Sequence, residues 1–527
     1  MQHTTSLNSL RLNTLTPLRG RLALSALASA AVLALAACGG GGSGSSTASS
    51  SGQATTAATY SGAVSGLGSI VVNGVRFSTS GASTTDAESS GAYARAFALG
   101  TTVSVTGDVD DNSATATASS ITVHGGVRGA VTAVDTTSAI KTLTVAGQTI
   151  QVDANTVFEG LNSASLSLAG LKAAVDAANL TVTAADTVYA EVYVVGDATS
   201  GFLATRVEQK AAIAEGYAVV GKIVTGSLNA TSFGLLLRNG VTVTVDYSTA
   251  TVRPNGVTLA EGTAVRVVST TNPSTLSSGD TLTASKVVVK RDRAIMGRAK
   301  VRGAVAAISG TTLTVNDVTV DVSQARFDDG LTLAGLTVGT VLKVEGTFTN
   351  GVLVAREVEA DNREYDAANG GGVKLYGVVS SATVGTPSTF SIQGVTLTLP
   401  NVTPALTLPT NGTYVEVVAR MVSGVLTVVR IGNEDNRAQR SFELYGTTPC
   451  ATGSSDLMTS FPLTLRNGTT TTVDGRTATI ELENSVSMTS GLANAQCFVE
   501  VKGAVTSTNT VTATRIEVKA RTVTPAN

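Results

Sequence analysis

The chain has 527 residues, too many for one ordinary domain of about 100–200 residues. Its residues are 43% hydrophobic and 14% charged, so apolar material suffices for folded cores. The net charge is −2, or −5 once the three arginines before residue 38 are removed with a leader, and this balance argues against nucleic acid as a partner because phosphate binding needs a concentrated basic surface.

The first forty residues predict a lipoprotein signal peptide. Arg19 and Arg21 precede a short apolar run over 22–37, which is too short and too rich in alanine for a membrane span. The lipobox residues are Leu35, Ala36, Ala37 and Cys38. Small residues before Cys38 suit the signal peptidase, and the Cys38 thiol receives the lipid. The alternative is a plain secretory signal followed by a chance cysteine.

Residues 38–59 predict a flexible linker between the lipid anchor and the folded part. This segment consists almost entirely of Gly, Ser, Thr and Ala, which cannot bury a core. Gly39 follows the lipidated cysteine where an Asp would favour retention in the inner membrane. We therefore expect a lipid-anchored protein of the outer membrane, facing the periplasm or the cell surface.

From residue 60 onward, an internal repeat is the strongest signal in the sequence. Each unit opens with Gly-x-Val, passes through strands with apolar residues at every second position, and reaches a Val-x-Val-x-Gly strand. It closes with Ala-x-x-Val or Ala-x-x-Ile, as at 355–358. The predicted segments are a signal peptide (1–37), the lipidated cysteine with its linker (38–59), and six β-repeats (60–125, 126–210, 211–293, 294–362, 363–436 and 437–527).

The period of two predicts an all-β protein, a tandem array of about six small five-stranded OB-like β-barrels. Asn-Gly pairs lie between predicted strands and suit type I′ hairpin turns, whose central residues both need a positive φ. These pairs are Asn73-Gly74, Asn239-Gly240, Asn350-Gly351 and Asn467-Gly468. The one helical pattern, about 166–178, falls between the third and fourth strands of the second unit, where an OB-type barrel accepts an insert.

A family resemblance follows from these motifs. The opening 60–77, with Tyr-Ser-Gly-Ala-Val followed by Val-Val-Asn-Gly-Val-Arg-Phe, resembles the start of repeats in the domain-of-unknown-function family numbered 5666. The Val-Glu-Gly and Ala-x-x-Ile/Val-Glu endings are similar as well. The resemblance covers about 60–520 and implies a secreted or lipid-anchored β-repeat protein. It implies no activity and no catalytic residues.

Cys450 and Cys497, both in the last unit, are the cysteines that remain after Cys38. An isolated pair in an oxidising envelope predicts a disulfide. The bond would join the first and fourth strands, which are neighbours in an OB-type barrel. Two free buried thiols are the alternative, and metal ligation is less favoured because no His or third Cys lies nearby in the sequence.

Side chains for catalysis are scarce in the mature chain. Its one histidine is His124, predicted to be a solvent-facing residue between the first and second units. A single histidine excludes metal centres with two or more histidine ligands in one chain. The sequence also lacks a Gly-x-Ser-x-Gly elbow, a Walker loop and a Cys-x-x-Cys pair. We therefore predict no catalytic residues, no metal and no cofactor.

Three weaker patterns have simpler interpretations. Residues 108–112 resemble half of a calcium loop, but Ser113 and Ser119 stand where the turn glycine and the bidentate acid are needed, which favours a polar hairpin turn. The basic stretch 290–302 could meet phosphates or an acidic glycan, although a solvated connector is the simpler interpretation. Glu357 and Glu359 alternate with a valine and are predicted to be solubilising residues on an outer face.

These observations favour a non-enzymatic cell-envelope lipoprotein whose tandem β-domains act as a binding or scaffold module. Its partners would be the membrane, through the lipid, and envelope proteins or glycans. The alternative is a surface-exposed adhesin. A polysaccharide- or peptidoglycan-active hydrolase is less favoured, because no unit shows an acidic cleft that the others lack.

Overall fold

The computed structural model describes residues 58–523, and the predicted signal peptide, the lipobox with Cys38 and most of the linker therefore lie outside the described residues. The gaps within this range are 110–114, 182–186, 196–201, 238–239, 274, 291–296, 316–317, 329, 350–351, 361–371, 403–404, 434–441, 484–485, 490–491, 493 and 508–509. Among the described residues, no helix has the length and apolar character needed to cross a membrane.

The described part of the chain is mostly β-structure, as predicted. Five strands at the start of the described part pair with one another in a closed ring. These are β1 (Ala58–Leu67), β2 (Ile70–Val72), β3 (Val75–Ser78), β5 (Thr102–Val109) and β6 (Thr115–His124). Strand β1 pairs with β2, β2 with β3, β3 in parallel with β6, β6 with β5, and β5 with β1. We call this closed five-stranded barrel ring 1. Closure leaves no free sheet edge.

The same pairing order recurs five more times in the described residues. Ring 2 consists of β7 (Val127–Asp135), β8 (Lys141–Val145), β9 (Gln148–Val152), β11 (Tyr189–Val195) and β12 (Leu203–Lys210). Ring 3 consists of β13 (Tyr217–Ile223), β14 (Ser232–Leu236), β15 (Thr242–Asp246), β17 (Ala264–Ser269) and a fifth strand divided into β18 (Thr281–Thr283) and β19 (Lys286–Val289).

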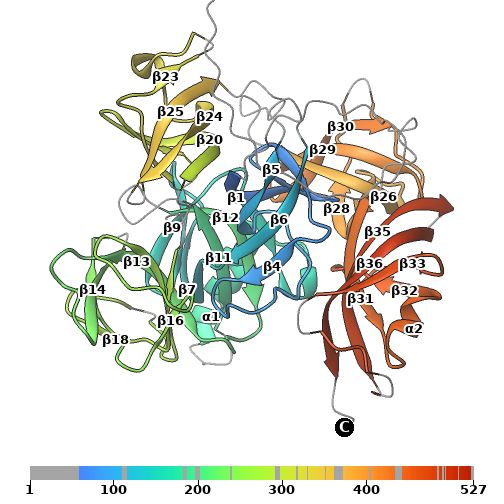
Figure 1. Ribbon diagram of the computed structural model, residues 1–527, viewed down its shortest axis with the longest axis horizontal. Coiled ribbons are helices and arrows are strands. Elements are labelled where there is room, and N and C mark those ends of the chain that lie inside the picture. Colours follow the sequence, from blue (N-terminus) through green and yellow to red (C-terminus); the bar gives the residue numbers. More distant parts are fainter. Residues whose placement is uncertain are drawn as a thin grey trace, which may run out of the picture. The chain divides into compact units, whose positions relative to one another are not determined.

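Ring 4 consists of β20 (Gly297–Ser309), β21 (Thr312–Val315), β22 (Val318–Asp321), β24 (Val341–Thr349) and β25 (Val352–Ala360). Ring 5 consists of β26 (Val373–Thr383), β27 (Thr389–Ile392), β28 (Val395–Thr398), β29 (Tyr414–Val422) and β30 (Val425–Asn433). Ring 6 consists of β31 (Phe442–Pro449), β32 (Ser460–Thr464), β33 (Thr470–Asp474), β35 (Ala495–Ser507) and β36 (Thr510–Val523), and Figure 1 shows these strands at the red end of the colour bar.

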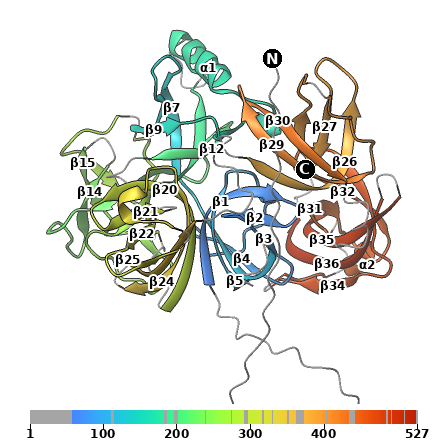
Figure 2. The same ribbon diagram turned by 90° about the horizontal axis from the view of Figure 1, so that it is seen from above.

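Within the described residues, each ring except ring 5 also has short additional strands or helices attached to it. Five strands add in parallel to the fifth strand of their ring: β4 (Ser83–Asp86), β10 (Val157–Glu159), β16 (Thr251–Arg253), β23 (Arg326–Phe327) and β34 (Thr479–Leu482). Helix α1 (Leu168–Thr181) lies beside β7 at one end of ring 2 (Figure 2), and it buries Leu171 and Val175. This confirms the helix predicted between the third and fourth strands. Ring 6 also carries α2 (Ser454–Leu457).

The repeated Val-x-Val-x-Gly motif is explained by a β-bulge in the fourth strand. In ring 4 the register shifts between Glu345 and Gly346, and a Cβ on Gly346 would lie 2.2 Å from the carbonyl oxygen of Val354. The same shift occurs at Gly107 in ring 1. A bulge brings the partner strand too close for a side chain, so glycine is required there.

The Asn-Gly prediction is right at one turn and wrong at another. Asn73 and Gly74 both have positive φ (51° and 76°) and join β2 to β3, as a type I′ turn requires. Between β32 and β33, only Gly468 of the pair has a positive φ (80°), and its N–H donates to Leu465. That geometry is a type I turn followed by a left-handed glycine, because the loop is one residue longer.

The rings are grouped by shared sheets and cores. Within the described residues there are four sheets and four hydrophobic clusters. Rings 1 and 5 share one sheet through β1 and β26, and rings 2 and 3 share another through β7 and β13. Rings 4 and 6 each have a sheet of their own. Neighbouring repeats in sequence are therefore not always neighbours in a sheet.

Candidate functional site: a buried charge cluster shared by three rings

One outer position of the fourth strand is polar in every ring. This residue pairs, across the two neighbouring strands, with the residue that stands just before the opening glycine of the repeat. Because side chains alternate between the two faces of a strand, it points away from the ring interior. The six residues are Ser104, Glu191, Arg266, Lys343, Glu416 and Glu500. On an isolated barrel they would face water. In this chain, however, Glu191, Arg266 and Glu500 are 4%, 2% and 2% exposed.

Two of these residues take part in what we call the junction cluster, made of Glu88, Arg128, Glu191 and Arg266. Glu88 follows β4 of ring 1, Arg128 and Glu191 lie on β7 and β11 of ring 2, and Arg266 lies on β17 of ring 3. Their side chains are between 2% and 11% exposed. The cluster therefore joins three rings through charged side chains that are buried away from water.

The geometry of the cluster is that of a complete ion-pair network. Arg128 donates to Glu88 at 2.9 Å and lies 3.5 Å from Glu191. Arg266 donates to Glu191 at 3.1 Å and also pairs with Glu88. Both guanidinium groups donate further to backbone oxygens, those of Gly216 and Gly126, at 2.7 and 2.6 Å. Two acids thus balance two bases, which is what burial of charge requires.

The electrostatics hold this arrangement in its charged form. Burial by itself would raise the pKa of Glu88, but Arg266 and Arg128 outweigh burial and lower it to about 2. Burial likewise opposes the charge of Arg128, while Glu191 and Glu88 raise its pKa. The Glu88 carboxylate and the Arg128 guanidinium consequently stay ionised over the whole physiological range.

A cavity of about 310 Å³ opens beside the cluster. Arg95, Glu215 and Lys286 provide its exposed charges, and Tyr93 and Tyr193 line its wall. Burial raises the pKa of Tyr93 to about 12 and that of Tyr193 well above its ordinary value, so both phenols remain hydrogen-bond donors at neutral pH. The cavity can accommodate a small charged molecule. Its described lining includes no histidine or cysteine that could act as a nucleophile or base.

A second network joins rings 1, 2 and 6. Arg206 of β12, only 2% exposed, donates to Glu159 at 2.5 Å and to the carbonyl oxygen of Leu99 in ring 1 at 3.2 Å. Arg466, from the turn after β32 in ring 6, donates to the same Glu159 at 3.3 Å. Ion pairs therefore fix rings that are far apart in the sequence.

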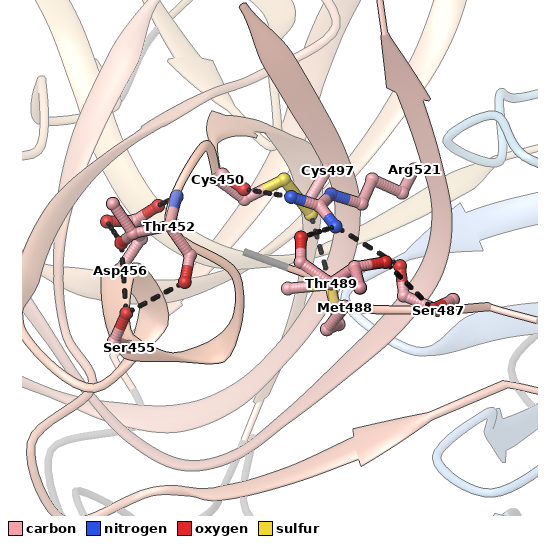
Figure 3. Close-up of a disulfide and its surroundings, with 9 residues drawn as sticks. All are labelled: Cys450, Thr452, Ser455, Asp456, Ser487, Met488, Thr489, Cys497 and Arg521. Atoms are coloured by element: carbon pink, nitrogen blue, oxygen red, sulfur yellow. Dashed lines mark hydrogen bonds between the residues drawn. A yellow bond between two sulfur atoms is a disulfide. The ribbon is translucent and has the colours of Figure 1, made fainter. Parts of the chain in front are cut away.

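The disulfide lies in ring 6, and Figure 3 shows its surroundings. Cys450 follows β31, Cys497 lies on β35, and their Cα atoms are 5.8 Å apart. Both residues are fully buried. Arg521 of β36 donates to the carbonyl oxygens of Cys450 at 2.8 Å and of Thr489 at 2.6 Å. The bond thus joins the first and fourth strands of the ring, which are paired neighbours.

Among the described residues, one acidic group has the spacing to hold a metal ion: Asp328, Glu357 and Glu359, whose oxygens lie within 4.8 Å of one another. Arg326 already pairs with Asp328 and Glu357, and Lys343 lies 3.1 Å from Glu359. Val358 between the two glutamates is fully buried. The two glutamates therefore lie on the outer face, as predicted, and their charges have partners within the ring.

The structure corrects two other interpretations of the sequence. His124 is the last residue of β6 rather than a linker residue, and its Nε2 lies 2.8 Å from Ser104 Oγ, because β6 stays paired with β5 to its end. Arg298, Lys300 and Arg302 lie on β20 and pair in register with β24, so this part of the basic stretch is strand rather than connector.

The calcium-like stretch begins on β5, whose Val109 pairs with Ala116 of β6. Residues 110–114 lie outside the described residues. Residues 291–296 of the basic stretch lie outside them as well.

Sequence reasoning missed the junction cluster. Glu191 and Arg266 look like ordinary polar residues of half-buried strands, and Glu88 lies in a Ser-rich loop. One signal was available: the outer position of the fourth strand is charged or polar in all six repeats. That regularity does not say which rings meet, because the pairing partners are between 40 and 178 residues apart.

The comparisons with known proteins identify the family. The family described as Domain of unknown function (DUF5666) matches residues 61–122, 128–208, 302–359 and 454–517, just over half of the chain. The chain therefore belongs to the DUF5666 family, and the domain is repeated four times in it.

No curated protein matches the chain. Among solved structures, a chain titled "drosophila Unr CSD456" is similar at 12% identity, over 42% of this chain and 98% of that one, with a TM-score of 0.14. A likeness of this size carries no structural argument.

Proposed function

We propose that this protein is a non-enzymatic lipoprotein of the cell envelope whose six rings are OB-like domains, joined into a rigid scaffold or binding module. The lipobox at Leu35–Cys38 and the polar linker support the location. The pairing order within each ring, in which the third strand runs parallel to the fifth, supports the OB-like assignment. The proposed partners are the membrane, through the lipid on Cys38, and envelope proteins or glycans.

The observation that carries the scaffold proposal is the junction cluster. Charged side chains that would solubilise an isolated barrel are buried between rings instead, and each has its opposite charge there. Breaking such a network leaves uncompensated charge in a low dielectric. Rings joined only by flexible linkers would not be expected to bury their charged side chains against one another in this way. A fixed spacing between binding surfaces is the property that such a scaffold supplies.

Distance measurements test the rigidity. Spin labels would be placed at Ile140→Cys in ring 2 and Thr249→Cys in ring 3, two exposed positions, in a chain with Cys38→Ser. We expect one narrow distance distribution, and a broader one after Arg266→Met because that change breaks the junction cluster. A broad distribution in the chain with an intact cluster would contradict the scaffold proposal.

Labelling with palmitate, followed by protease treatment of cells, tests the location. We expect label in the wild type and none in Cys38→Ser. Digestion of ring 6 on intact cells would favour the surface-exposed adhesin. Protection until the outer membrane is permeabilised would place the scaffold in the periplasm.

A further inference from the structure

A loop of ring 1 is held by carboxylates of ring 6. We call residues 78–84 the loop; they run from the last residue of β3 through the connection 79–82 into the first two residues of β4. Ser78 Oγ donates to Glu443 at 2.6 Å, and the backbone N–H of Thr79 donates to the same carboxylate at 3.1 Å. The N–H of Gly81 donates to Glu517 at 3.1 Å, and that of Thr84 to Glu483 at 3.2 Å. The loop thus supplies neutral donors, and ring 6 supplies the charged acceptors.

Glu443, Glu483, Glu500 and Glu517 form what we call the acid cradle. Glu443, Glu500 and Glu517 are 2%, 2% and 6% exposed, and the side chain of Glu483 is 8% exposed. Lys519, which is 3% exposed, lies 2.9 Å from Glu517, 3.2 Å from Glu500 and 3.6 Å from Glu483. Four buried carboxylates therefore share one buried ammonium group.

Two further cations lie near the cradle. Arg515 lies 3.6 Å from Glu517, but its guanidinium also pairs with Glu481 outside the cradle. Lys502 of β35 lies opposite Glu443 in the strand register. The negative charge of the fully ionised cradle is thus only partly balanced. Burial and the closeness of like charges therefore both oppose full ionisation of the cradle.

Glu500 lies at the centre of this cluster and faces charged or titratable groups on every side. Glu443 and Tyr445 act on it from β31, and Glu517 and Lys519 from β36, while Glu483, just after β34, reaches it only through Lys519 and Glu517. From ring 1, Thr79 Oγ1 donates to Glu500 at 3.2 Å.

Burial, together with the nearby Glu443 carboxylate and against the opposing effect of Lys519, raises the pKa of Glu500 to about 7. Burial also raises the pKa of Glu483. Tyr445 does not compete for this proton, because burial raises the pKa of its phenol well above the ordinary value.

We propose that the acid cradle is a proton-dependent clasp between the first and the last ring, tight while the cradle holds one shared proton and weaker once that proton is lost. Its occupant is the loop 78–84 of the same chain. The clasp responds to pH because its acids outnumber its bases, whereas the junction cluster pairs two acids with two bases. The proposal does not depend on the lipid anchor or on a scaffold function.

The direction of the pH effect follows from linkage. When the clasp is open, Glu500 meets water and titrates near its ordinary pKa of 4.5. When the clasp is closed, the proton is held more tightly. Closing is therefore favoured at low pH and loses up to about tenfold in its equilibrium constant per pH unit between about 4.5 and about 7, with little further change above pH 7.

Amide hydrogen exchange of the mature full chain tests the clasp. Protection of peptides covering 78–84 is measured between pH 4.5 and 8 and corrected for the intrinsic pH dependence of exchange. We expect a fall of about a hundredfold across this range, while peptides from the β8–β9 hairpin keep constant protection. Constant protection of 78–84 in the wild type would overturn the proposal without any variant.

Two matched variants locate the proton. Glu500→Gln carries a neutral group of the same shape, and we expect its protection of 78–84 to stay at pH 8 within threefold of its value at pH 5. The control is Glu416→Gln, at the equivalent position of ring 5, also opposite a tyrosine but paired with Arg430 at 2.9 Å. The control should titrate like the wild type. A parallel loss in Glu500→Gln, or flattening in Glu416→Gln, would contradict a proton held on Glu500.

Discussion

At the scale of single residues, a few charged side chains on outer strand positions determine which rings are joined. Arg266 is among the largest fully buried side chains of the described residues, although it lies on the outside of its own ring. Its guanidinium reaches carboxylates of two other rings. An outer position is therefore a surface position only when no second ring covers it.

Removing Arg266 should leave Glu88 and Glu191 with too little positive charge. We expect Arg266→Met to lower the free energy of unfolding of rings 2 and 3, which share one core, by about 3–5 kcal/mol, the usual cost of an uncompensated buried charge. Urea denaturation measures this change. The control is Arg326→Met, since Arg326 is 69% exposed and water screens its pair with Glu357, so its removal should have a much smaller effect. Equal effects of the two variants would contradict a special role of the junction cluster.

Glu88 should make part of the stability dependent on acid. Because its pKa is lowered to about 2 from 4.5, its charge stabilises the folded chain above pH 4.5, and this stabilisation is lost as the pH falls from about 4.5 to about 2. The difference in unfolding free energy between wild type and Glu88→Gln should therefore be about 3 kcal/mol larger at pH 6 than at pH 2. A difference for Glu88→Gln that does not change with pH would refute the assignment.

At the scale of elements, ring 6 differs from the other rings by its covalent bond. Its disulfide joins β35 to the end of β31, across the same pair of strands whose hydrogen bonds close the ring. The bulge glycine, by contrast, recurs at Gly107, Gly346 and Gly503, because the fourth strand must bend against the fifth in each of these rings.

The double change Cys450→Ala and Cys497→Ala should destabilise ring 6 selectively. The two cysteines are 47 residues apart, and opening a loop of that length should cost about 2–4 kcal/mol. Hydrogen exchange of β31 and β35 measures the loss, and treatment of the wild type with reductant should reproduce it. Ring 4, which has no cysteine, serves as the internal reference. An unchanged ring 6 would mean that the disulfide adds no stability.

At the scale of the described part of the chain, unfolding should follow the four shared sheets and cores rather than the repeats. Rings 2 and 3 share a core that contains Leu143, whereas Leu342 belongs to the core of ring 4 alone. Both leucines are fully buried. The cooperative units are therefore expected to be rings 1 with 5, rings 2 with 3, ring 4 and ring 6.

A matched pair of cavity-forming substitutions tests this division. Leu342→Ala should lower the stability of ring 4 by about 2–5 kcal/mol and leave the other rings unchanged. Leu143→Ala should lower the protection of rings 2 and 3 together by a similar amount. Hydrogen exchange resolved by ring measures both. Loss of protection confined to ring 2 after Leu143→Ala would show that the shared core is not cooperative.

Much of this organisation could be predicted from local sequence patterns. Alternation of apolar residues determined the strands, the Val-x-Val-x-Gly motif marked the bulged fourth strand, and the helix at 168–181 showed its own period. Cys450 and Cys497 were paired because no other cysteine follows Cys38. These features could be predicted because each depends on residues within one repeat.

The contacts between rings were decided by the tertiary structure alone. Nothing in the sequence around Thr79 indicates Glu443 as its acceptor, because the two residues are 364 positions apart and both are polar residues that could equally be exposed to solvent. The same holds for Glu88 and Arg266. The sequence by itself determined the ring, since alternation is a local property. Burial of an outer charge depends on which ring covers it, and that depends on packing over the whole described chain.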